Sequence, residues 1–495
     1  MSRVCLVGVG APSFRAAQVH AGPGLRLAHF ATALARDGHE LTVVVVHNGS
    51  SNSRAPAEPC PGVVTIEGRT VHTLDVSESA LTQDECLSRV RAFAPEAVVG
   101  VTALGASLAC RLRLDAPLWA DVFGDLMAEA QAKALVQRND AGIARFWATL
   151  QPVLHDADRF SAVSNAQADA LIGQLGLAGR LTHANAGTPL VSVIPCAAER
   201  PAAGTERPYR AHGIDDDTFV VFWSGSFNTW CDVETLFAGV ERAMRRVGNI
   251  VFMSTGGEVR GHDETTYRRF CALVNASSLR DRFKLLGWVD SEVAEQCVRR
   301  ANLGIIVERD IYERRLGSEN RVVQWMARGL SCVTTARSEL GRSLVANGLA
   351  LAVPPRNPEA LADVLIAAAA EPGRVQSMGA ACAAYCERCF GYQDTARSLV
   401  EWCGSPLRAA DHGCERVVTL GSLSEPRAMA QLLEAYLNDL ELKQVAYRSV
   451  RWLWRRLVRR SGAPGVSRRR RALGRSAAPS RRTNEQGSPE PCRVE

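Results

Sequence analysis

Residues 303–335 read LGIIVERDIYERRLGSENRVVQWMARGLSCVTT, and this stretch decides which fold we expect. An apolar run at 303–307 is followed by a charged loop, by helical spacing over 320–328, and by a second apolar run after Gly329. The pattern predicts a strand, a loop, a helix and a strand. In an open α/β sheet, loops at the carboxyl ends of strands face the ligand crevice, and a helix N-terminus offers free N–H groups to an anion. A loop built in this way suits a diphosphate.

The same alternation extends on both sides of this stretch. Further strands are expected at residues 3–10, 41–46, 63–66, 70–74, 97–101, 117–121, 159–163, 219–223, 250–254 and 283–286. Helices are expected at 25–35, 82–93 and 147–156, from Val233, from Ser291 to Arg300, and from Pro358 to about Cys403. Repeated alternation of strand and helix indicates parallel sheets with right-handed crossovers.

The expected fold class is α/β, with two Rossmann-like domains facing a cleft and a C-terminal helical and basic tail. The 495 residues, 46% hydrophobic and 22% charged, suffice for two buried cores. The expected segments are a first domain at 1–200, a second domain at 201–403, a linker at 404–426, an amphipathic helix at 427–460 and a disordered basic tail at 461–495.

The composition favours a cytoplasmic protein. An uncharged apolar stretch in the N-terminal half, residues 97–110, is too short to span a bilayer. Residues 1–10 lack the basic start and the long apolar region of a signal peptide. The 15 cysteines are an odd number scattered over a long chain, which fits reduced intracellular thiols better than a disulfide framework.

Two motifs resemble those of a known enzyme family. Residues 324–333, QWMARGLSCV, are similar to the E-A-M-A-C-G-x-P-V-V ending of the nucleotide-sugar-binding stretch in family 4 glycosyltransferases. Residues 22–26, GPGLR, with 34–43, LARDGHELTV, resemble the opening of the same enzymes. The resemblance stops beyond Gly404. It implies a GT-B fold and transfer of a sugar from a nucleoside diphosphate sugar to a hydroxyl acceptor, with retention and without metal or other cofactor.

The chain departs from that family at its charged positions. The family's Glu-x7-Glu pair would fall on Leu316 and Gln324, while the nearby acids are Glu308 and Glu313. The loop at 224–232 lacks the Arg and Lys that usually hold the diphosphate, and has Asn228 and Cys231-Asp232 instead. The nearest cations by role are Arg315 and Arg321.

The resemblance, carried over position by position, implies a set of site residues. The diphosphate is expected near Ser226, Asn228, Thr229, Gly317, Ser318, Asn320 and Arg321, with Arg315 as a supporting cation and Gly22 and Gly24 in a glycine loop facing the phosphates. Backbone atoms of Trp288 and Val289 are expected to hold the base, Glu313 to contact the donor sugar, and Asp125 to lie near the anomeric centre or the acceptor hydroxyl. A structural alternative for Asp121 and Asp125 is capping of the helix that begins near Leu126.

Several other motifs have structural interpretations that outweigh the functional ones. Cys382, Cys386 and Cys389 match the spacing of a radical-SAM cluster but fall in a helical run. Asp156 with Asp158, and the acidic run 215–217, imitate a metal-binding Asp-x-Asp motif but lie at element boundaries. Gly8 and Gly10 do not continue into a dinucleotide-binding motif. Ser164, with Gln167 three residues later, predicts a helix cap and not a nucleophile. We therefore expect no metal site.

The basic charge of the chain is confined to its tail. Residues 448–482 contain 13 arginines and no Asp, Glu or Lys, so the preceding body is mildly acidic. Within 446–460 an apolar stripe opposes an arginine face, which is typical of a helix lying in a membrane interface or packed on the body of a protein. An anionic surface on the inner face of the membrane is a potential partner for 446–482. No module for specific nucleic-acid binding is present.

Two alternative functions remain open. A nucleotide-sugar epimerase of GT-B fold would share the cleft and act on the donor without an acceptor. The altered Glu-x7-Glu region also allows a non-catalytic nucleotide-sugar or glycan-binding protein. For a transferase, the acceptor would be a glycan, a lipid-linked glycan or a secondary metabolite.

Overall fold

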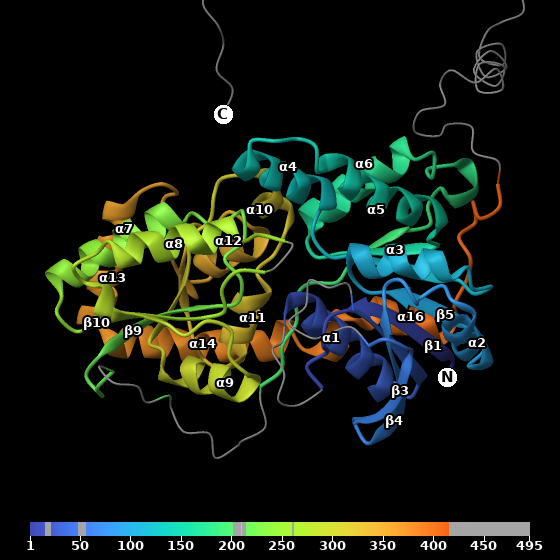
Figure 1. The fold of residues 1–495 in the computed structure, drawn as a ribbon, viewed down its shortest axis with the longest axis horizontal. Coiled ribbons are helices and arrows are strands. Elements are labelled where there is room, and N and C mark those ends of the chain that lie inside the picture. Colours follow the sequence, from blue (N-terminus) through green and yellow to red (C-terminus); the bar gives the residue numbers. More distant parts are fainter. Residues whose placement is uncertain (15–20, 48–55, 201–208, 210–213, 260–261, 415–495) are drawn as a thin grey trace, which may run out of the picture. The chain divides into compact units, whose positions relative to one another are not determined.

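A computed structural model describes residues 1–14, 21–47, 56–200, 209, 214–259 and 262–414 (Figure 1). They form two sheets. The first has eight strands in the order β3-β4-β2-β1-β5-β6-β7-β8, and the second has six in the order β11-β10-β9-β12-β13-β14. Every neighbouring pair is parallel except β3 and β4. The predicted pair of parallel α/β sheets is confirmed, with one antiparallel edge strand in the first.

The first sheet and its helices come from the N-terminal half of the described chain. Its strands are β1 (Arg3–Val9), β2 (Glu40–His47), β3 (Cys60–Ile66), β4 (Arg69–Ser77), β5 (Ala97–Gly100), β6 (Leu118–Val122), β7 (Arg159–Ala162) and β8 (Val191–Val193). Its helices are α1 (Gly22–Arg36), α2 (Asp84–Ala92), α3 (Thr102–Leu112), α4 (Leu126–Gln137), α5 (Ile143–Asp156) and α6 (Asn165–Leu177), with a 3-10 turn at His183–Asn185.

The second sheet follows. Its strands are β9 (Phe219–Ser224), β10 (Ile250–Thr255), β11 (Phe283–Leu285), β12 (Leu303–Ile306), β13 (Cys332–Thr334) and β14 (Ala350–Ala352). The helices are α7 (Val233–Arg246), α8 (Thr265–Asn275), α9 (Ser291–Arg300), α10 (Tyr312–Leu316), α11 (Asn320–Ala327), α12 (Glu339–Ala346), α13 (Pro358–Ala370), α14 (Pro372–Cys389), α15 (Tyr392–Thr395) and α16 (Arg397–Gly404), with a 3-10 turn at Arg280–Arg282.

Both faces of the first sheet are buried, because alternate residues of a strand point to opposite faces. On β1, Val4 and Leu6 pack with α1, whereas Cys5 and Val7 pack with α3 and α5. Burial on both faces explains why the strands read as continuous apolar runs.

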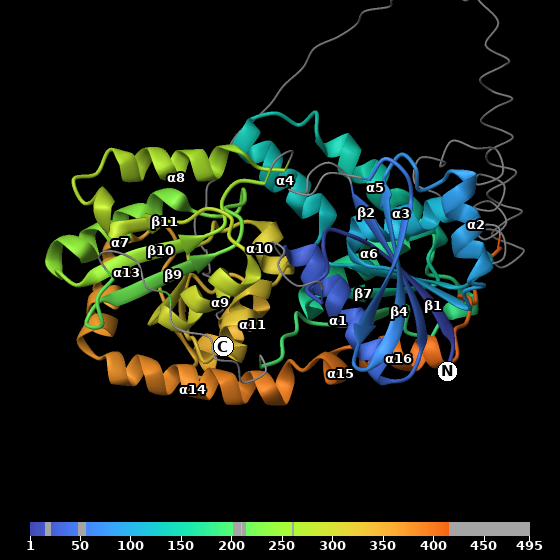
Figure 2. The same cartoon turned by 60° about the horizontal axis from the view of Figure 1, so that its bottom comes forward.

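The last described helix returns to the first domain. Leu399 and Cys403 of α16 share a core with α1 and with Val4 and Leu6 of β1. In Figures 1 and 2 the chain passes from α14, beside the second sheet, through α15 to α16, beside the first. The C-terminal end of the described chain therefore belongs to the core of the first domain.

The structure also corrects the expected elements. Helix α3 follows β5 without a loop, in a region where only a strand was expected. The charged loop after β12 contains the short helix α10. Helix α1 begins at Gly22, so the expected glycine loop is its first turn. Residues 415–495 lie outside the described part of the chain, and so do the predicted amphipathic helix and basic tail. None of the described helices is long and apolar enough to cross a bilayer.

Candidate active site

The strand order of the second sheet locates its crevice. Strands β10 and β11 lie on one side of β9, and the chain then returns to β12 on the other side. In open α/β sheets a ligand binds outside the carboxyl ends of the two strands at such a reversal. The loops after β9 and β12 contact each other there, since Asp232 N donates to Val307 O (3.1 Å) and Arg309 N donates to Trp230 O (2.8 Å).

A buried guanidinium occupies the loop after β12. Arg314 pairs with both carboxylate oxygens of Glu313, and its Nη1 lies 2.8 Å from Glu308 Oε1. Its Cζ lies 4.6 Å from the ring centroid of Trp230. Burial lowers the pKa of Arg314, but the two carboxylates outweigh this effect and raise it well above its ordinary value. Burial raises the pKa of Glu313 in spite of Arg314.

A third buried carboxyl precedes helix α11. Glu319 is the N-cap residue of α11, and its Oε2 accepts from Ser338 Oγ (2.6 Å). Burial, followed by the neighbouring Glu308, raises its pKa well above the ordinary value. The other oxygen of each carboxyl, Glu319 Oε1 and Glu308 Oε2, has no hydrogen-bond partner among the described residues.

Arg321 lies in the first turn of α11. Its Cζ is 4.5 Å from the ring centroid of Trp223, and its Nη2 donates to Ser226 O (2.9 Å). Burial lowers its pKa, and nearby Cys231 and Glu308 oppose that shift. Nη1 finds no acceptor within the part of the chain that the structure describes. Arg321 therefore has donor capacity left for a ligand.

The loop after β9 adds short polar side chains. Asn228 Nδ2 donates to Ser226 Oγ (2.9 Å), whereas Asn228 Oδ1 and Thr229 Oγ1 are buried without a partner in the described structure. Gly225 and Gly256 both have a positive φ, and a Cβ on Gly256 would overlap the carbonyl of Gly225. Only glycine at 256 allows the ends of β9 and β10 to approach so closely.

Three other predicted residues lie between α10 and α11 or at the start of α11. Gly317 N donates to Glu313 O (2.8 Å), Ser318 hydrogen-bonds the Cys196 thiol, and Asn320 is the first residue of α11. Arg315 is exposed, with its Cζ 5.8 Å from the ring of Tyr312. Arg314 therefore replaces Arg315 as the buried cation of this loop.

The residues predicted to hold the base follow β11. Trp288 and Val289 come after Gly287, which has a positive φ of 68°. Trp288 Nε1 donates to Glu258 O (2.8 Å), and Gly256 N donates to Gly287 O (2.6 Å). These bonds place Trp288 beside the loop that follows β10, at the same edge of the sheet as Arg321.

In the first domain, the predicted glycines lie at the other strand-order reversal. The order reverses between β1 and β5, and helix α1 follows β1. A Cβ on Gly24 would overlap the carbonyl oxygen of Ala11, whereas Gly22 has open space around it. Glycine at 24 thus lets the start of α1 lie against the loop after β1.

Asp125 acts as a cap. It is the N-cap of α4, where Oδ1 accepts from Ala128 N (2.7 Å) and Oδ2 accepts from Gln174 Nε2 (2.7 Å). The capping interpretation is confirmed for Asp125 and is wrong for Asp121. Asp121 is fully buried and pairs with Arg26, 95 residues earlier, at 2.8 Å. The catalytic role of Asp125 stays a prediction.

Residues of the first domain contact the second at this edge. Ser164, which caps α6 as predicted, donates to Leu316 O (2.7 Å). Asn165 N donates to Glu339 Oε2 (3.0 Å), and Glu129 Oε1 lies 3.0 Å from His262 Nε2. Polar groups of α4 and of the start of α6 therefore bond α10, α12 and the loop that follows β10.

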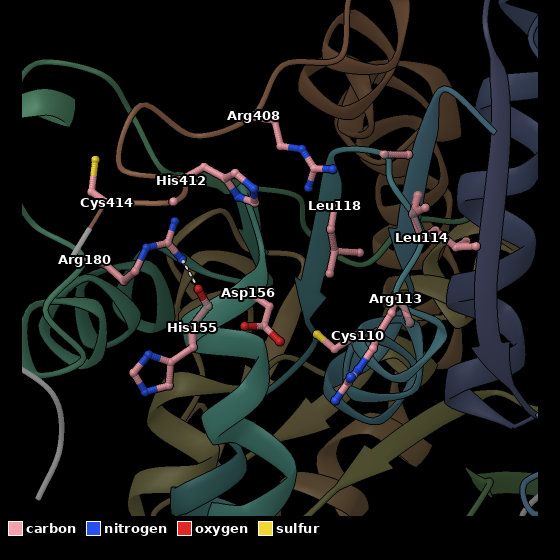
Figure 3. Close-up of a pocket in the computed structure, with 14 residues that line it drawn as sticks. Cys110, Arg113, Leu114, Leu118, His155, Asp156, Arg180, Arg408, His412 and Cys414 are labelled. Atoms are coloured by element: carbon pink, nitrogen blue, oxygen red, sulfur yellow. Dashed lines mark hydrogen bonds between the residues drawn. The ribbon is translucent and has the colours of Figure 1, made fainter. Parts of the chain in front are cut away.

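A separate cavity of about 670 Å³ lies at the opposite edge of the first sheet (Figure 3). Val98 and Leu118, near the amino ends of β5 and β6, line it. Arg180 and Arg408 also line it, and they pair with Asp411 and Asp115. Because carboxylates already neutralise both guanidinium groups, this cavity offers less charge to an anion than the crevice above the second sheet.

The cysteines with cluster-like spacing lie on α14. Cys382 and Cys386 are buried on that helix, and burial raises the pKa of both thiols to about 12. Their hydrogen bonds go to backbone oxygens, Cys382 Sγ to Leu349 O (3.1 Å) and Cys386 Sγ to Ala198 O (3.8 Å). These positions agree with the structural interpretation.

Comparison with known proteins adds the class of enzyme. Residues 218–371 match the family model of glycosyl transferases group 1. Sucrose-phosphate synthase from Thermosynechococcus elongatus has a similar structure, with a TM-score of 0.59 at 16% identity over 81% of this chain and 98% of that chain. Residues 218–371 therefore form a glycosyltransferase-type domain, and the described chain has a GT-B fold.

Two other solved structures resemble this glycosyltransferase. Anabaena Alr3699/HepE, in complex with UDP and glucose, has a TM-score of 0.55 at 13% identity, covering 82% of this chain and 100% of that chain. An E. coli protein described as trehalose-6-phosphate, bound with UDP-2-fluoro glucose, has the same TM-score, identity and coverage. No curated protein matches in sequence.

Sequence reasoning missed Arg314 and Glu319. Both lie within the stretch that was singled out, beside residues that were chosen. For Glu319, its place directly before a predicted helix was a usable signal, because acidic residues are favoured at the start of a helix. For Arg314 no local signal was present, since the sequence does not indicate which of two adjacent arginines is buried.

Proposed function

We propose that this glycosyltransferase moves a sugar from a nucleoside diphosphate sugar to a hydroxyl acceptor. The observation that carries the proposal is the Arg321 guanidinium at the N-terminus of α11. It is fixed by Trp223 and Ser226, and its Nη1 has no acceptor in the described structure. A hydrogen-bonding guanidinium at a helix N-terminus, in the crevice where the strand order reverses, is suited to binding a diphosphate.

The chemistry follows from the charge on the leaving group. As the bond from the sugar to the diphosphate breaks, negative charge grows on the diphosphate. Fixed N–H groups and a guanidinium that already point at that position stabilise the charge without reorganising. Thr229 Oγ1 adds a hydroxyl donor from the loop after β9. This arrangement requires no metal ion, and we include none in the reaction.

The similar structures support the same donor class. Those proteins are in complex with UDP, UDP-glucose or UDP-2-fluoro glucose. For this chain we propose a nucleoside diphosphate sugar without specifying its base. Retention of the anomeric configuration, a glycan or lipid-linked acceptor, contact of Glu313 with the donor sugar, and action of Asp125 near the acceptor hydroxyl are parts of the proposal.

We further propose that the enzyme works in the cytoplasm and that its tail holds it at an anionic membrane surface. The support is compositional, because residues 448–482 carry 13 arginines without an acidic residue. Near an anionic leaflet each arginine contributes about 1 kcal/mol. Such a position would let the cleft meet a lipid-linked acceptor in two dimensions.

The second candidate is a protein that binds a nucleotide sugar without transferring it. Glu313 and Asp125 favour it, because both oxygens of each carboxyl already accept hydrogen bonds within the protein. Saturable donor binding with no hydrolysis or transfer over many acceptors would support this candidate. Turnover of the donor sugar without any acceptor would indicate an epimerase.

Arg321→Ala tests the proposal. A panel of UDP, GDP, ADP, CDP and dTDP in a thermal-shift assay first identifies the base, since a ligand at about 100 times its Kd adds about 2.7 kcal/mol of stability. Loss of one charge-assisted hydrogen bond, about 1.5–3 kcal/mol, should then weaken donor use roughly 10- to 150-fold in the variant.

The matched control is Arg388→Ala. Arg388 also stacks on an aromatic ring, with its Cζ 5.7 Å from the centroid of Tyr385, but it is exposed on α14. This variant should bind the nucleotide as the unmodified protein does. Equal affinity and turnover in the two variants would contradict the assignment of Arg321.

A further inference from the structure

The crevice of this glycosyltransferase holds more acidic than basic groups. Three carboxyls, those of Glu308, Glu313 and Glu319, are buried around Arg314, and a second buried guanidinium, that of Arg321, interacts with Glu308 and Glu319. If all five groups were ionised, the cluster would carry one net negative charge. A diphosphate brings further negative charge to the same place, and like charges in a buried site repel strongly.

The hydrogen bonds of two of these carboxyls indicate where a proton lies. Glu308 Oε1 accepts from Arg314, and Glu319 Oε2 accepts from Ser338. The remaining oxygens, Glu308 Oε2 and Glu319 Oε1, are buried without a partner among the described residues, and the two carboxyls are within hydrogen-bonding reach of each other. Two ionised carboxylates so placed have no donor between them, whereas one proton satisfies both.

We propose that Glu308 and Glu319 share one proton, and that a bound diphosphate depends on that proton. With it, the cluster is neutral, so the guanidinium of Arg321 and the N-terminus of α11 give the diphosphate side a net positive potential. Without it, the ionised carboxylate of Glu319 lies at the N-terminus of α11 and competes with the diphosphate for the same N–H groups. The nucleotide sugar therefore binds when the proton lies between Glu308 and Glu319.

The other groups around Glu319 do not remove the need for this proton. Both carboxylate oxygens of Glu313 accept hydrogen bonds from Arg314, so Glu313 provides no hydrogen-bond donor for Glu319. The thiols of Cys196, Cys231 and Cys332 also face the cluster, and burial raises the pKa of Cys196 to about 11 and of Cys231 to about 12. Burial raises the pKa of Cys332 further. Burial therefore favours the neutral form of all three thiols.

The first test uses stability and needs no ligand. In the unfolded chain a Glu loses its proton near pH 4.3, whereas burial and the neighbouring Glu308 raise the pKa of Glu319 in the folded protein. Stability gained from that proton is present below the unfolded pKa and is lost as pH rises through the folded pKa. Glu319→Gln, which keeps the shape and cannot ionise, should therefore exceed the unmodified chain in Tm by a margin that grows as pH rises above about 4.3 and levels off above the folded pKa of Glu319. A margin that does not change with pH overturns the shared proton.

The control is Glu295→Gln. Glu295 is also buried and hydrogen-bonds Arg328, on α9 and outside the crevice. Since it has a cation as partner and no second carboxyl, its replacement should lower Tm and show no growing advantage at high pH. A rising advantage in this variant as well would mean that any buried glutamate gives the signal, and would also overturn the inference.

The second test uses calorimetry with UDP, and it rests on the proposed function. Above the folded pKa of Glu319, UDP affinity of the unmodified chain should fall about tenfold per pH unit, as for one linked proton. The affinity of Glu319→Gln should not show that fall. Titration of UDP itself is common to both proteins and cancels in the comparison.

The two tests separate the two ideas. A pH-independent affinity in the unmodified chain overturns the coupling between proton and diphosphate. Absence of binding by UDP and by every other diphosphate of the panel contradicts the proposed function, while the Tm comparison still decides whether the pair shares a proton. If Glu319→Gln does not fold, proton uptake on UDP binding, measured for the unmodified chain in two buffers of different ionisation enthalpy, gives the same decision.

Discussion

Replacing Asp121 by Asn should destabilise the first domain strongly, although the two side chains have nearly the same shape. Asp121 Oδ1 accepts from Arg26 Nη2 (2.8 Å) and from Ser161 Oγ (2.7 Å). Oδ2 accepts from Arg26 Nε (3.1 Å) and from Thr102 N (3.3 Å). An Asn can accept on one side only, because its Nδ2 would face two donors on the other.

The expected size of the effect follows from burial. The side chains of Arg26 and Asp121 are 1% and 0% exposed, so the variant leaves an uncompensated guanidinium inside the protein. Breaking a buried pair in this way costs about 3–5 kcal/mol. For a domain of this size about 1 kcal/mol corresponds to a Tm shift of about 2–4 °C, so we expect a fall of roughly 6–20 °C.

Differential scanning calorimetry measures this fall directly. Asp363→Asn is the control, because Asp363 pairs with Arg246 at 2.6 Å while both side chains are more than half exposed. Exposed pairs contribute about 0–1 kcal/mol, so the control should move Tm by no more than about 4 °C. Equal shifts in the two variants would refute the argument that the Arg26–Asp121 pair is a buried support.

Two further predictions concern catalysis and the tail. Asp125→Asn keeps the bond to Ala128 N and should retain full activity if Asp125 is only a helix cap, whereas loss of rate at unchanged donor affinity, measured by steady-state kinetics and calorimetry, would make it catalytic. Truncation after Lys443 should abolish co-sedimentation with anionic vesicles at low salt, because it removes all of residues 446–482. Neutral vesicles and high salt are the controls, and binding that survives truncation would contradict a membrane role for the tail.

The periodic elements could be predicted because the information for them is local. The spacing of apolar residues over 320–328 corresponds to α11, and α9 and α13 begin at Ser291 and Pro358 as expected, capped by Asp290 and Asn357. Each of these signals depends on residues within one turn. Helix α10 was missed because Tyr312–Leu316 has only five residues, too few for a period to be recognised against charged neighbours.

The electrostatic partners could not be predicted because they are brought together by the fold. Arg26 and Asp121 are 95 residues apart and meet because α1 begins where β6 ends. Glu319 and Ser338 are separated by a helix and a strand, yet their oxygens lie 2.6 Å apart. Nothing in either sequence neighbourhood distinguishes these side chains from solvated ones, so the capping hypothesis for Asp121 was reasonable and wrong.

The same fact explains why the charged positions can depart from those of the resembled family while the fold stays. A diphosphate site needs positive potential at one place, and the physics does not specify which strand or helix supplies it. The loop after β9 has Asn228 and Cys231-Asp232 where cations are usual, and Arg321 reaches the backbone of that same loop from α11. Arg314 cannot serve equally, because Glu308 and Glu313 already neutralise it. The affinity for the nucleotide sugar should therefore depend on the guanidinium of Arg321 and on the protonation of its acidic neighbours. A single substitution at Arg321 should weaken it more than the loss of one of two free cations would.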